Sequence, residues 1–252
     1  MAPSLSLIVP AYNEVATIQQ TLRAIRDYLA PRGYEFELIV AADGTDGTRE
    51  AAAALAGELP VTVMGEPHRR GKGRGVREGV RIATGEIVGF LDADYKVAID
   101  EIERILPWFD AGYDVVIGSR AAAGAEIRVA QPWYRRLGSK AFALVMRPLV
   151  GLWGIADTQC GFKFFRAGVA RDLFSRQRID GYMFDVEVLS LALRSGYRVK
   201  EVGVNWRDDG DTRLKLVSGN YRNLKDLFRI RFGRRAAPAA NPTRSTLNRF
   251  KS

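Results

Sequence analysis

Short apolar runs alternate with helical periodicities along the first 120 residues, and this alternation constrains the fold more than any other feature. Residues 5–10 are typical of a buried strand, and apolar residues then recur at helical spacing over 15–29. Further strands are expected at 35–41, 61–64, 86–91 and 113–118, with helices at 45–57, 72–83 and 99–109. Such alternation predicts an α/β fold with a mostly parallel central sheet covered by helices on both faces.

The pattern changes after residue 120. We expect a loop at 121–130, an amphipathic helical stretch at 133–153 interrupted at Pro148, strands at 162–166 and 197–204, and helices at 184–195 and 217–232. These elements predict a single domain over residues 1–212, a basic amphipathic segment over 213–235 and a disordered tail over 236–252.

The chain contains one cysteine, Cys160, and one histidine, His68. An internal disulfide is therefore excluded, which fits a reducing compartment. Neither zinc coordination nor a histidine-based triad is expected. A catalytic metal would instead bind to carboxylates, the ligands of Mg²⁺ and Mn²⁺.

The net charge of +9 lies at the C-terminal end. Residues 213–252 contain eleven Lys or Arg and one acidic residue, whereas the preceding 212 residues contain 27 basic and 28 acidic ones. Within 213–235, eight cations alternate with aliphatic and aromatic residues, which favours contact with an anionic membrane surface. A solvated helix packed on the domain and a nucleic-acid-binding segment are the alternatives.

Targeting signals are not evident in the sequence. The first six residues contain no basic side chain, and the apolar run that follows is too short for a signal peptide. The longest apolar stretch, 141–156, is interrupted by Arg147 and Pro148 and falls short of the ~20 residues that span a bilayer. We therefore expect a cytoplasmic protein, peripheral at the cytoplasmic face of the membrane.

Four polar segments follow the predicted strands. They are Pro10-Ala-Tyr-Asn-Glu14, Asp43-Gly-Thr-Asp-Gly-Thr48, Arg69-Arg-Gly-Lys-Gly-Arg74 and Asp92-Ala-Asp94. Each alone is a weak signal, since Asp-Gly is a common turn and Asp-x-Asp occurs often by chance. Because the carboxyl ends of parallel strands form one binding edge, the four segments together predict a nucleotide site.

The residue types in these segments suit a nucleotide diphosphate. Asp92 and Asp94 can both reach one divalent cation, which would stabilise the negative charge of a diphosphate leaving group. Lys72 begins a predicted helix whose N-terminus favours anions. Tyr12 offers a ring face to a base, and Asp43 can accept a hydrogen bond from the base.

The sequence resembles the family 2 glycosyltransferases, inverting enzymes, and within them the dolichyl-phosphate glucosyltransferase branch, near the dolichyl-phosphate mannose synthases. The resemblance covers residues 5–210, and 157–163 is its most specific part. Its motifs are Val9-Pro-Ala-Tyr-Asn-Glu14, Asp43-Gly44, Gly71-Lys-Gly73, Leu91-Asp-Ala-Asp94, Gly118-Ser-Arg120, Asp157-Thr-Gln-Cys-Gly-Phe-Lys163 and Phe184-Asp-Val-Glu187.

The resemblance implies a Rossmann-like nucleotide-binding glycosyltransferase fold with a donor half over 1–120 and an acceptor half over 121–212. It implies transfer of a hexose, glucose from UDP-glucose first, to a polyprenyl phosphate; GDP-mannose and a hydroxyl acceptor are the alternatives. The implied nucleotide-binding residues are Pro10, Tyr12, Glu14, Asp43, Lys72, Asp92, Ala93 and Asp94. Asp92 and Asp94 would hold Mg²⁺ or Mn²⁺, and Arg120 would face the donor phosphates and the acceptor.

The acceptor decides which further residues matter. A polyprenyl phosphate is already an anion and needs cations to position it, and the expected acceptor-side residues are Arg120, Arg135, Gln159 and Lys163, with Arg128, Arg136 and Lys140 as further cations. A hydroxyl acceptor would need a general base, for which Asp185 is the candidate. The alternative role of Asp185 is to cap its helix.

Three departures from the family pattern stand out. The usual Asp-Asp-Gly-Ser is Ala42-Asp-Gly-Thr45, one residue shorter, and Lys96 stands where mannose synthases tend to have Gln. The N-terminal membrane anchor of the eukaryotic glucosyltransferase is not expected here.

Two rival classes are disfavoured by the motifs. A sugar nucleotidyltransferase usually has a Gly-rich loop after the first strand, where this chain has Pro10 to Glu14. A nucleic-acid-binding module would have no need of Asp92 and Asp94.

Overall fold

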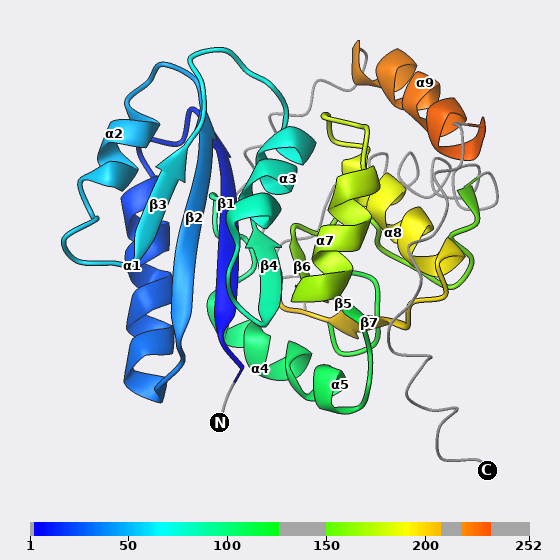
Figure 1. The fold of residues 1–252 in the computed structure, drawn as a ribbon, viewed down its shortest axis with the longest axis horizontal. Helices are drawn as coiled ribbons and strands as arrows, with labels where there is room; N and C mark the ends of the chain where they lie inside the picture. Colours follow the sequence, from blue (N-terminus) through cyan, green and yellow to red (C-terminus); the bar gives the residue numbers. More distant parts are fainter. Residues whose placement is uncertain (1–2, 126–149, 208–217, 233–252) are drawn as a thin grey trace.

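Seven strands form one sheet in the order β3-β2-β1-β4-β6-β5-β7 (Figure 1). The computed structural model describes residues 3–125, 150–207 and 218–232. The strands are β1 (Leu5–Tyr12), β2 (Phe36–Asp43), β3 (Val61–Met64), β4 (Ile87–Leu91), β5 (Val115–Ser119), β6 (Phe162–Arg166) and β7 (Val199–Gly203). Neighbouring strands run parallel except around β6, which is antiparallel to both β4 and β5. The predicted mostly parallel sheet is confirmed.

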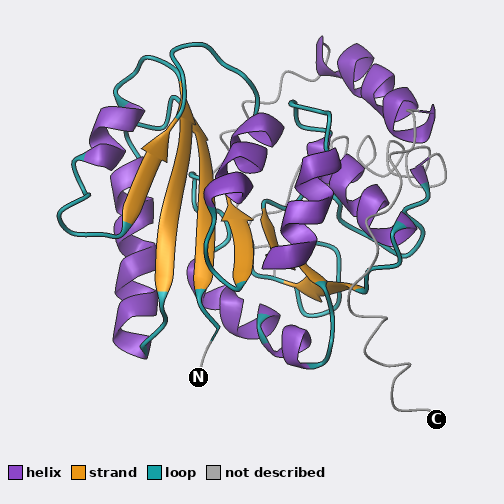
Figure 2. Cartoon of the chain, in the orientation of Figure 1, coloured by secondary structure: helices purple, strands orange, loops and turns teal. Residues whose placement is uncertain are grey.

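Helices cover both faces of the sheet (Figure 2). Because successive side chains of a strand point to opposite faces, Leu7 and Val9 pack on one side and Ile8 on the other. The first face is covered by α1 (Ile18–Leu29), α2 (Thr48–Ala53), α4 (Ile102–Ile105) and α5 (Pro107–Asp110). The second face is covered by α3 (Lys72–Ile82), α7 (Ala167–Arg176) and α8 (Phe184–Arg194), and α9 (Ser218–Phe232) adds Leu227 and Ile230 to the same core cluster.

Two predicted helices need correction, and one observed helix was not predicted. The helix expected over 45–57 is confined to α2, because Gly47 precedes it with a left-handed φ of 94°. The helix expected over 99–109 is a 3₁₀ turn (Ile99–Glu101) followed by α4 and α5, with Pro107 at the break. Pro lacks the N–H that would continue the helical hydrogen bonds. Helix α7 was not predicted, although its apolar residues Val169, Ala170, Leu173 and Phe174 are buried at helical spacing.

The last described helix, α9, confirms the helix predicted over 217–232. Its Leu227 and Ile230 are buried in the second core cluster, whereas Phe228 and Phe232 are 51% and 70% exposed. Among the helices of the described residues, none combines the length and the hydropathy that a membrane span requires. The stretch predicted over 133–153 lies mostly outside the described residues, and the tail over 236–252 lies entirely outside them.

Candidate functional site

The polar segments predicted at strand ends do meet at one edge of the sheet. Tyr12 and Asp43 are register partners at the ends of β1 and β2. Asp92 directly follows β4, and Arg120 directly follows β5. Because β6 is antiparallel to these strands, the loop 157–161 that precedes it arrives at the same edge.

Tyr12 and Asp43 form the part of the edge where a base is expected. The Tyr12 ring is 37% exposed, and the Arg69 guanidinium lies 4.4 Å from its centroid. Arg69 also donates a hydrogen bond of 3.0 Å to the Tyr182 hydroxyl. The Asp43 carboxylate accepts from the backbone N–H groups of Glu66 and Arg70, at 3.2 and 2.6 Å. Asp43 therefore also shapes the loop after β3.

Pro10 and Glu14 contribute to the backbone structure of this edge of the sheet. Pro10 is buried within β1, and the Glu14 backbone N–H donates to the Thr48 hydroxyl at 2.9 Å. Asp46, which the sequence reasoning missed, accepts from Thr48 and from the Val15 N–H. Burial opposes ionisation of Asp46, but these hydrogen bonds lower its pKa. The Asp-Gly-Thr sequence, typical of a side-chain-stabilised turn, was the available signal.

The helix N-terminus predicted to bind phosphate already has a backbone partner. The N–H groups of Gly73 and Arg74 donate to the Asp180 carbonyl, at 2.8 and 3.3 Å. A Cβ on Gly71 would lie 2.2 Å from the same oxygen. The positive contribution of α3 to the site is therefore the Lys72 side chain and not the free N–H groups that we expected.

Two lysines pair with the two carboxylates of the Asp92–Asp94 turn. The Lys72 ammonium lies 2.6 Å from Asp92 Oδ1, and the Lys96 ammonium lies 3.4 Å from Asp94 Oδ2. Burial opposes the charge of Lys72, but the nearby carboxylates, Asp92 foremost, raise its pKa above the ordinary value. The edge thus alternates positive and negative groups.

The turn is held from both sides. The Asp92 N–H donates to the Gly161 carbonyl at 3.2 Å, and the buried Ala93 accepts from the Thr21 hydroxyl through its carbonyl at 2.8 Å. A Cβ on Gly161 would lie 1.9 Å from Asp92 Oδ2. Gly161 therefore leaves the space that the Asp92 carboxylate occupies.

The donor set fits a hard divalent cation with other ligands from a substrate. Burial, followed by the charge of Asp92, raises the pKa of Asp94, so the two carboxylates are close enough to repel. A cation between them would relieve this repulsion. No cluster of three or more His, Cys, Asp or Glu suited to a metal occurs among the described residues. Carboxylate pairs completed by phosphate and water are typical of Mg²⁺ sites.

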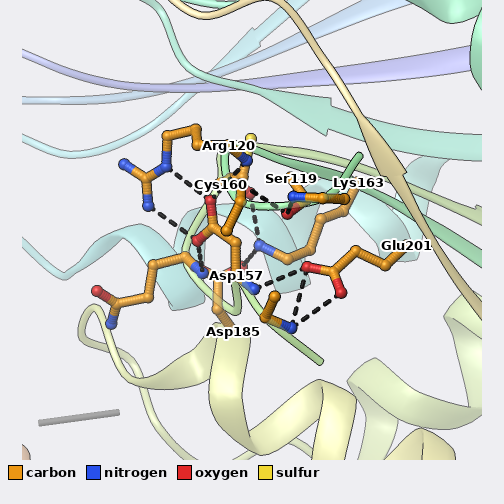
Figure 3. Close-up of polar contacts among 11 residues, drawn as sticks. Ser119, Arg120, Asp157, Cys160, Lys163, Asp185 and Glu201 are labelled. Atoms are coloured by element: carbon orange, nitrogen blue, oxygen red, sulfur yellow. Dashed lines mark hydrogen bonds and ion pairs between the residues drawn. The ribbon is translucent and has the colours of Figure 1, made fainter. Parts of the chain in front are cut away.

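Arg120 is held by a carboxylate that the sequence reasoning did not single out (Figure 3). Asp157 accepts from Arg120 Nε and Nη2, at 2.6 and 2.9 Å, and from its backbone N–H at 3.0 Å. Burial would raise the pKa of Asp157, but the guanidinium lowers it to about 2. Glu201 in β7 in turn accepts from the N–H groups of Ala156 and Asp157.

Lys163 and Asp185 lie deeper than expected. Their side chains are 1% and 3% exposed, and the ammonium lies 2.6 Å from the Asp185 carboxylate. Lys163 also donates to the Cys160 carbonyl at 2.6 Å. Burial raises the pKa of Asp185 in spite of the neighbouring Lys163. The pair is a closed contact beneath the site and does not present an acceptor-side cation or a solvent-facing base.

The helix-cap alternative for Asp185 does not describe its contacts either. Helix α8 begins at Phe184 with Met183 at the cap position, and the Asp185 carboxylate bonds to Lys163. Gln159 is exposed and its amide lies 3.8 Å from the Met183 sulfur. Arg135, like Arg128, Arg136 and Lys140, lies outside the described residues.

The sequence is similar to a known protein family and to several of its members. The model of glycosyl transferase family 2 matches residues 6–174. A dolichyl-phosphate beta-glucosyltransferase of Trichomonas vaginalis is 35% identical, over 89% of this chain and 70% of its own length. A dolichyl-phosphate beta-glucosyltransferase of Homo sapiens is 30% identical, over 90% of this chain and 74% of its own.

A solved structure shares the fold. Glucosyl-3-phosphoglycerate synthase from Mycobacterium tuberculosis, in complex with Mn²⁺, UDP-glucose and phosphoglyceric acid, superposes with a TM-score of 0.67. It is 20% identical, and the match covers 93% of this chain and 82% of that one. The family match over residues 6–174, together with the relatives of at least 30% identity, shows that this chain belongs to glycosyl transferase family 2.

Proposed function

We propose that this enzyme transfers glucose from UDP-glucose to a polyprenyl phosphate such as dolichyl phosphate, with inversion at the anomeric carbon. The observation that supports this most is the similarity to dolichyl-phosphate beta-glucosyltransferases across about nine-tenths of the chain. The solved structure of similar fold, which contains UDP-glucose and Mn²⁺, supports the choice of donor.

The donor would lie along the edge from β2 to β4. Pro10, Tyr12, Glu14 and Asp43 surround the proposed base position, and the Asp43 carboxylate has acceptor capacity beyond the two N–H groups that it already binds. Because Arg69 covers the Tyr12 ring, a stacking base would have to share or replace that contact. Lys72 lies where the diphosphate would meet Asp92.

Asp92 and Asp94 would hold Mg²⁺ or Mn²⁺. When bound, the cation would neutralise negative charge on the diphosphate oxygens as the bond to the sugar breaks. Lys72, held beside Asp92, would add a second positive charge for the same oxygens.

In the proposed reaction, an oxygen of the acceptor phosphate forms a bond to the anomeric carbon of glucose. The bond between that carbon and the β-phosphate oxygen breaks, and its electron pair leaves with UDP. A phosphate acceptor is an anion at neutral pH and needs no general base. The buried pairing of Asp185 with Lys163 supports this choice of acceptor. A hydroxyl acceptor would have to come within hydrogen-bond distance of its general base.

We also infer a peripheral contact with the cytoplasmic face of a membrane. In α9, Phe228 and Phe232 stack with their centroids 6.1 Å apart and are exposed beside the exposed Arg229 and Arg231. Aromatic rings flanked by cations suit the boundary of an anionic bilayer. This contact would bring the site to a lipid acceptor while the nucleotide sugar arrives from water.

A donor and acceptor panel tests the proposal. UDP-glucose and GDP-mannose would each be supplied with Mg²⁺ or Mn²⁺ and with an isoprenyl phosphate, the matching isoprenol or a soluble sugar. We expect transfer from UDP-glucose to the phosphate only. A preference for GDP-mannose would show that the proposed donor is wrong. Transfer to a hydroxyl acceptor would show that the proposed acceptor class is wrong.

A further inference from the structure

Trp206, which follows β7, has two cations against one indole ring. The Arg120 guanidinium carbon lies 5.5 Å from the ring centroid, and the Lys96 ammonium lies 5.7 Å from it. Trp is the strongest aromatic partner for cations, and contacts within about 6 Å stabilise both groups. Trp206 is 9% exposed and packed in the first core cluster, so its ring is a fixed support.

Arg120 is fixed in direction by its other partner. Asp157 pairs with Nε and Nη2, and Glu201 in turn holds the backbone of Asp157 (Figure 3). A guanidinium has five N–H groups. Within the described part of the chain, the side-chain hydrogen bonds of Arg120 are the two to Asp157, which leaves three N–H groups for a ligand. The Arg120 side chain is 30% exposed and so can be reached.

Lys96 connects Trp206 to the carboxylate pair. Its ammonium lies 3.4 Å from Asp94, and its backbone carbonyl accepts from the Arg207 N–H at 2.9 Å. The backbone contact holds Lys96 next to the segment that contains Trp206. Lys96 and Arg120 therefore come from two different strand ends and meet at one aromatic ring beside Asp94.

The charges at this position suit an anion with two negative charges. Asp157 offsets the charge of Arg120, so a phosphate that met Arg120 alone would find little net positive charge. Lys96 supplies a second positive charge, and a divalent cation on Asp94 would offset the negative charge of that carboxylate. A phosphate monoester has a charge of about −1.5 to −2 at pH 7, whereas a hydroxyl acceptor has none.

We propose that Lys96 and Arg120 bind the phosphate group of the acceptor and that Trp206 is the residue that positions both cations. The proposal rests on the proposed function, because it takes the acceptor to be a phosphate monoester. It adds Lys96 and Trp206 to the acceptor side, where Lys163 is buried and paired.

The test uses Lys96→Gln, Lys96→Arg and a matched control, Lys200→Gln. Lys200 also lies over an aromatic ring, 3.8 Å from the centroid of Trp108, and its second aromatic neighbour is Tyr113, so its cation lies against a different pair of rings from Trp206. The probe is a short-chain isoprenyl phosphate. Its Kd is measured by calorimetry with UDP and Mn²⁺ present, and its KM and the KM of UDP-glucose are measured by transfer assays.

Lys96→Gln is expected to raise the Kd and KM of the isoprenyl phosphate about tenfold or more, as for loss of a charged hydrogen bond. The KM of UDP-glucose should change less than about twofold, since the donor contacts remain. Lys96→Arg should recover most of the acceptor affinity, and Lys200→Gln should behave as the wild type. Trp206→Leu should weaken acceptor binding as Lys96→Gln does. The acceptor affinity of Trp206→Phe should lie between those of the wild type and Trp206→Leu. If Trp206→Leu fails to fold, the Lys96 variants decide alone.

Three results would overturn the inference. Unchanged acceptor constants in Lys96→Gln, with normal transfer by the wild type, would reject it and leave the proposed function standing. A rise in the KM of UDP-glucose or in the Kd of Mn²⁺, with acceptor constants unchanged, would assign Lys96 to the donor side instead. Absence of transfer to isoprenyl phosphates by the wild type would reject the proposed function itself, and the inference with it.

Discussion

Asp157 accepts four hydrogen bonds, three from Arg120 and one from the Gln159 N–H, while it is 8% exposed. A buried carboxylate is stable in the ionised form only when such partners replace water. The fall of its pKa from 3.8 to about 2 reflects this compensation. Single residues of this kind link stability to pH, and they can be tested one at a time.

Replacing Asp157 by Asn should destabilise the protein by about 2–3 kcal/mol at pH 7, at ~1.4 kcal/mol per pKa unit. Because the folded-state pKa is lowered, this stabilisation is present above about pH 4 and is lost as the pH falls from 4 towards 2. Urea unfolding at pH 7, 5 and 3 should therefore show a difference in the free energy of unfolding between wild type and variant. This difference should be the same at pH 7 and 5 and smaller at pH 3. A difference that stays the same at pH 3 would show that Arg120 does not lower the pKa of Asp157.

A second test at this scale concerns Asp43. Asp43→Ala should weaken UDP binding by about 1–3 kcal/mol, the cost of leaving a partner unpaired. Asp43 also holds the N–H groups of Glu66 and Arg70, so a loop effect has to be separated from base recognition. Calorimetry with UDP and with pyrophosphate separates them. Loss confined to UDP supports base recognition, whereas equal loss for pyrophosphate indicates that Asp43 only shapes the loop.

At the scale of elements, the antiparallel strand β6 has the largest consequence for the site. It places Gly161 beside Asp92 and Asp157 beside Arg120, because its amino end lies at the edge where the other strands have their carboxyl ends. If β6 ran in the opposite direction, this loop would lie at the other edge of the sheet, where the parallel strands begin. The direction of one strand therefore completes the site.

Gly161→Ala should displace the Asp92 carboxylate, since the added Cβ would lie 1.9 Å from Asp92 Oδ2. We expect a fold close to the wild type but at least a tenfold loss of Mn²⁺-dependent UDP affinity, on the order of 1.4 kcal/mol. Gly168→Ala is the matched control, because a Cβ there has nothing within 4 Å. Calorimetry in the presence of Mn²⁺ measures both variants, and equal affinities would contradict this account of Gly161.

Helix α9 provides the element-scale test of membrane contact. Phe228→Ser with Phe232→Ser should reduce flotation with anionic liposomes, because these rings are exposed while Leu227 and Ile230 anchor the helix to the core. Arg229→Glu with Arg231→Glu should also reduce it, at about 1 kcal/mol for each lost cation and more for reversal. Both variants should bind UDP as the wild type does. Flotation that is insensitive to both pairs would mean that α9 is a solvated helix.

At the scale of the whole molecule, donor and metal should stabilise the fold together. A ligand at about 100 times its Kd adds roughly 2.7 kcal/mol to the free energy of unfolding. For a chain of 252 residues this corresponds to a rise of about 5–10 °C in Tm. We expect this rise in Tm when UDP and Mn²⁺ are added together. No rise is expected when EDTA is added or when Asp94→Asn replaces the wild type. The turnover of Asp94→Asn should also fall by orders of magnitude. Full activity of Asp94→Asn in excess EDTA would reject the role of the carboxylate pair.

Much of this protein is determined by its sequence alone. The mostly parallel sheet, the helices on both faces and the meeting of Tyr12, Asp43 and Asp92 at one edge follow from local patterns. Apolar periodicity of two or of 3.6 residues selects strand or helix over a short window. The alternation of the two then requires parallel strands whose carboxyl ends coincide.

The tertiary structure decided which charged groups pair. Lys163 and Asp185, Arg120 and Asp157, and Lys96 with Trp206 are separated by 22, 37 and 110 positions in the chain. No local pattern contains these pairs, because the free energy of a charged side chain depends on its burial and on the partner that the fold brings to it. Lys163 looked like an acceptor-side cation in the sequence and became a buried partner of Asp185, whereas Trp206 gave no signal until the fold placed two cations against it.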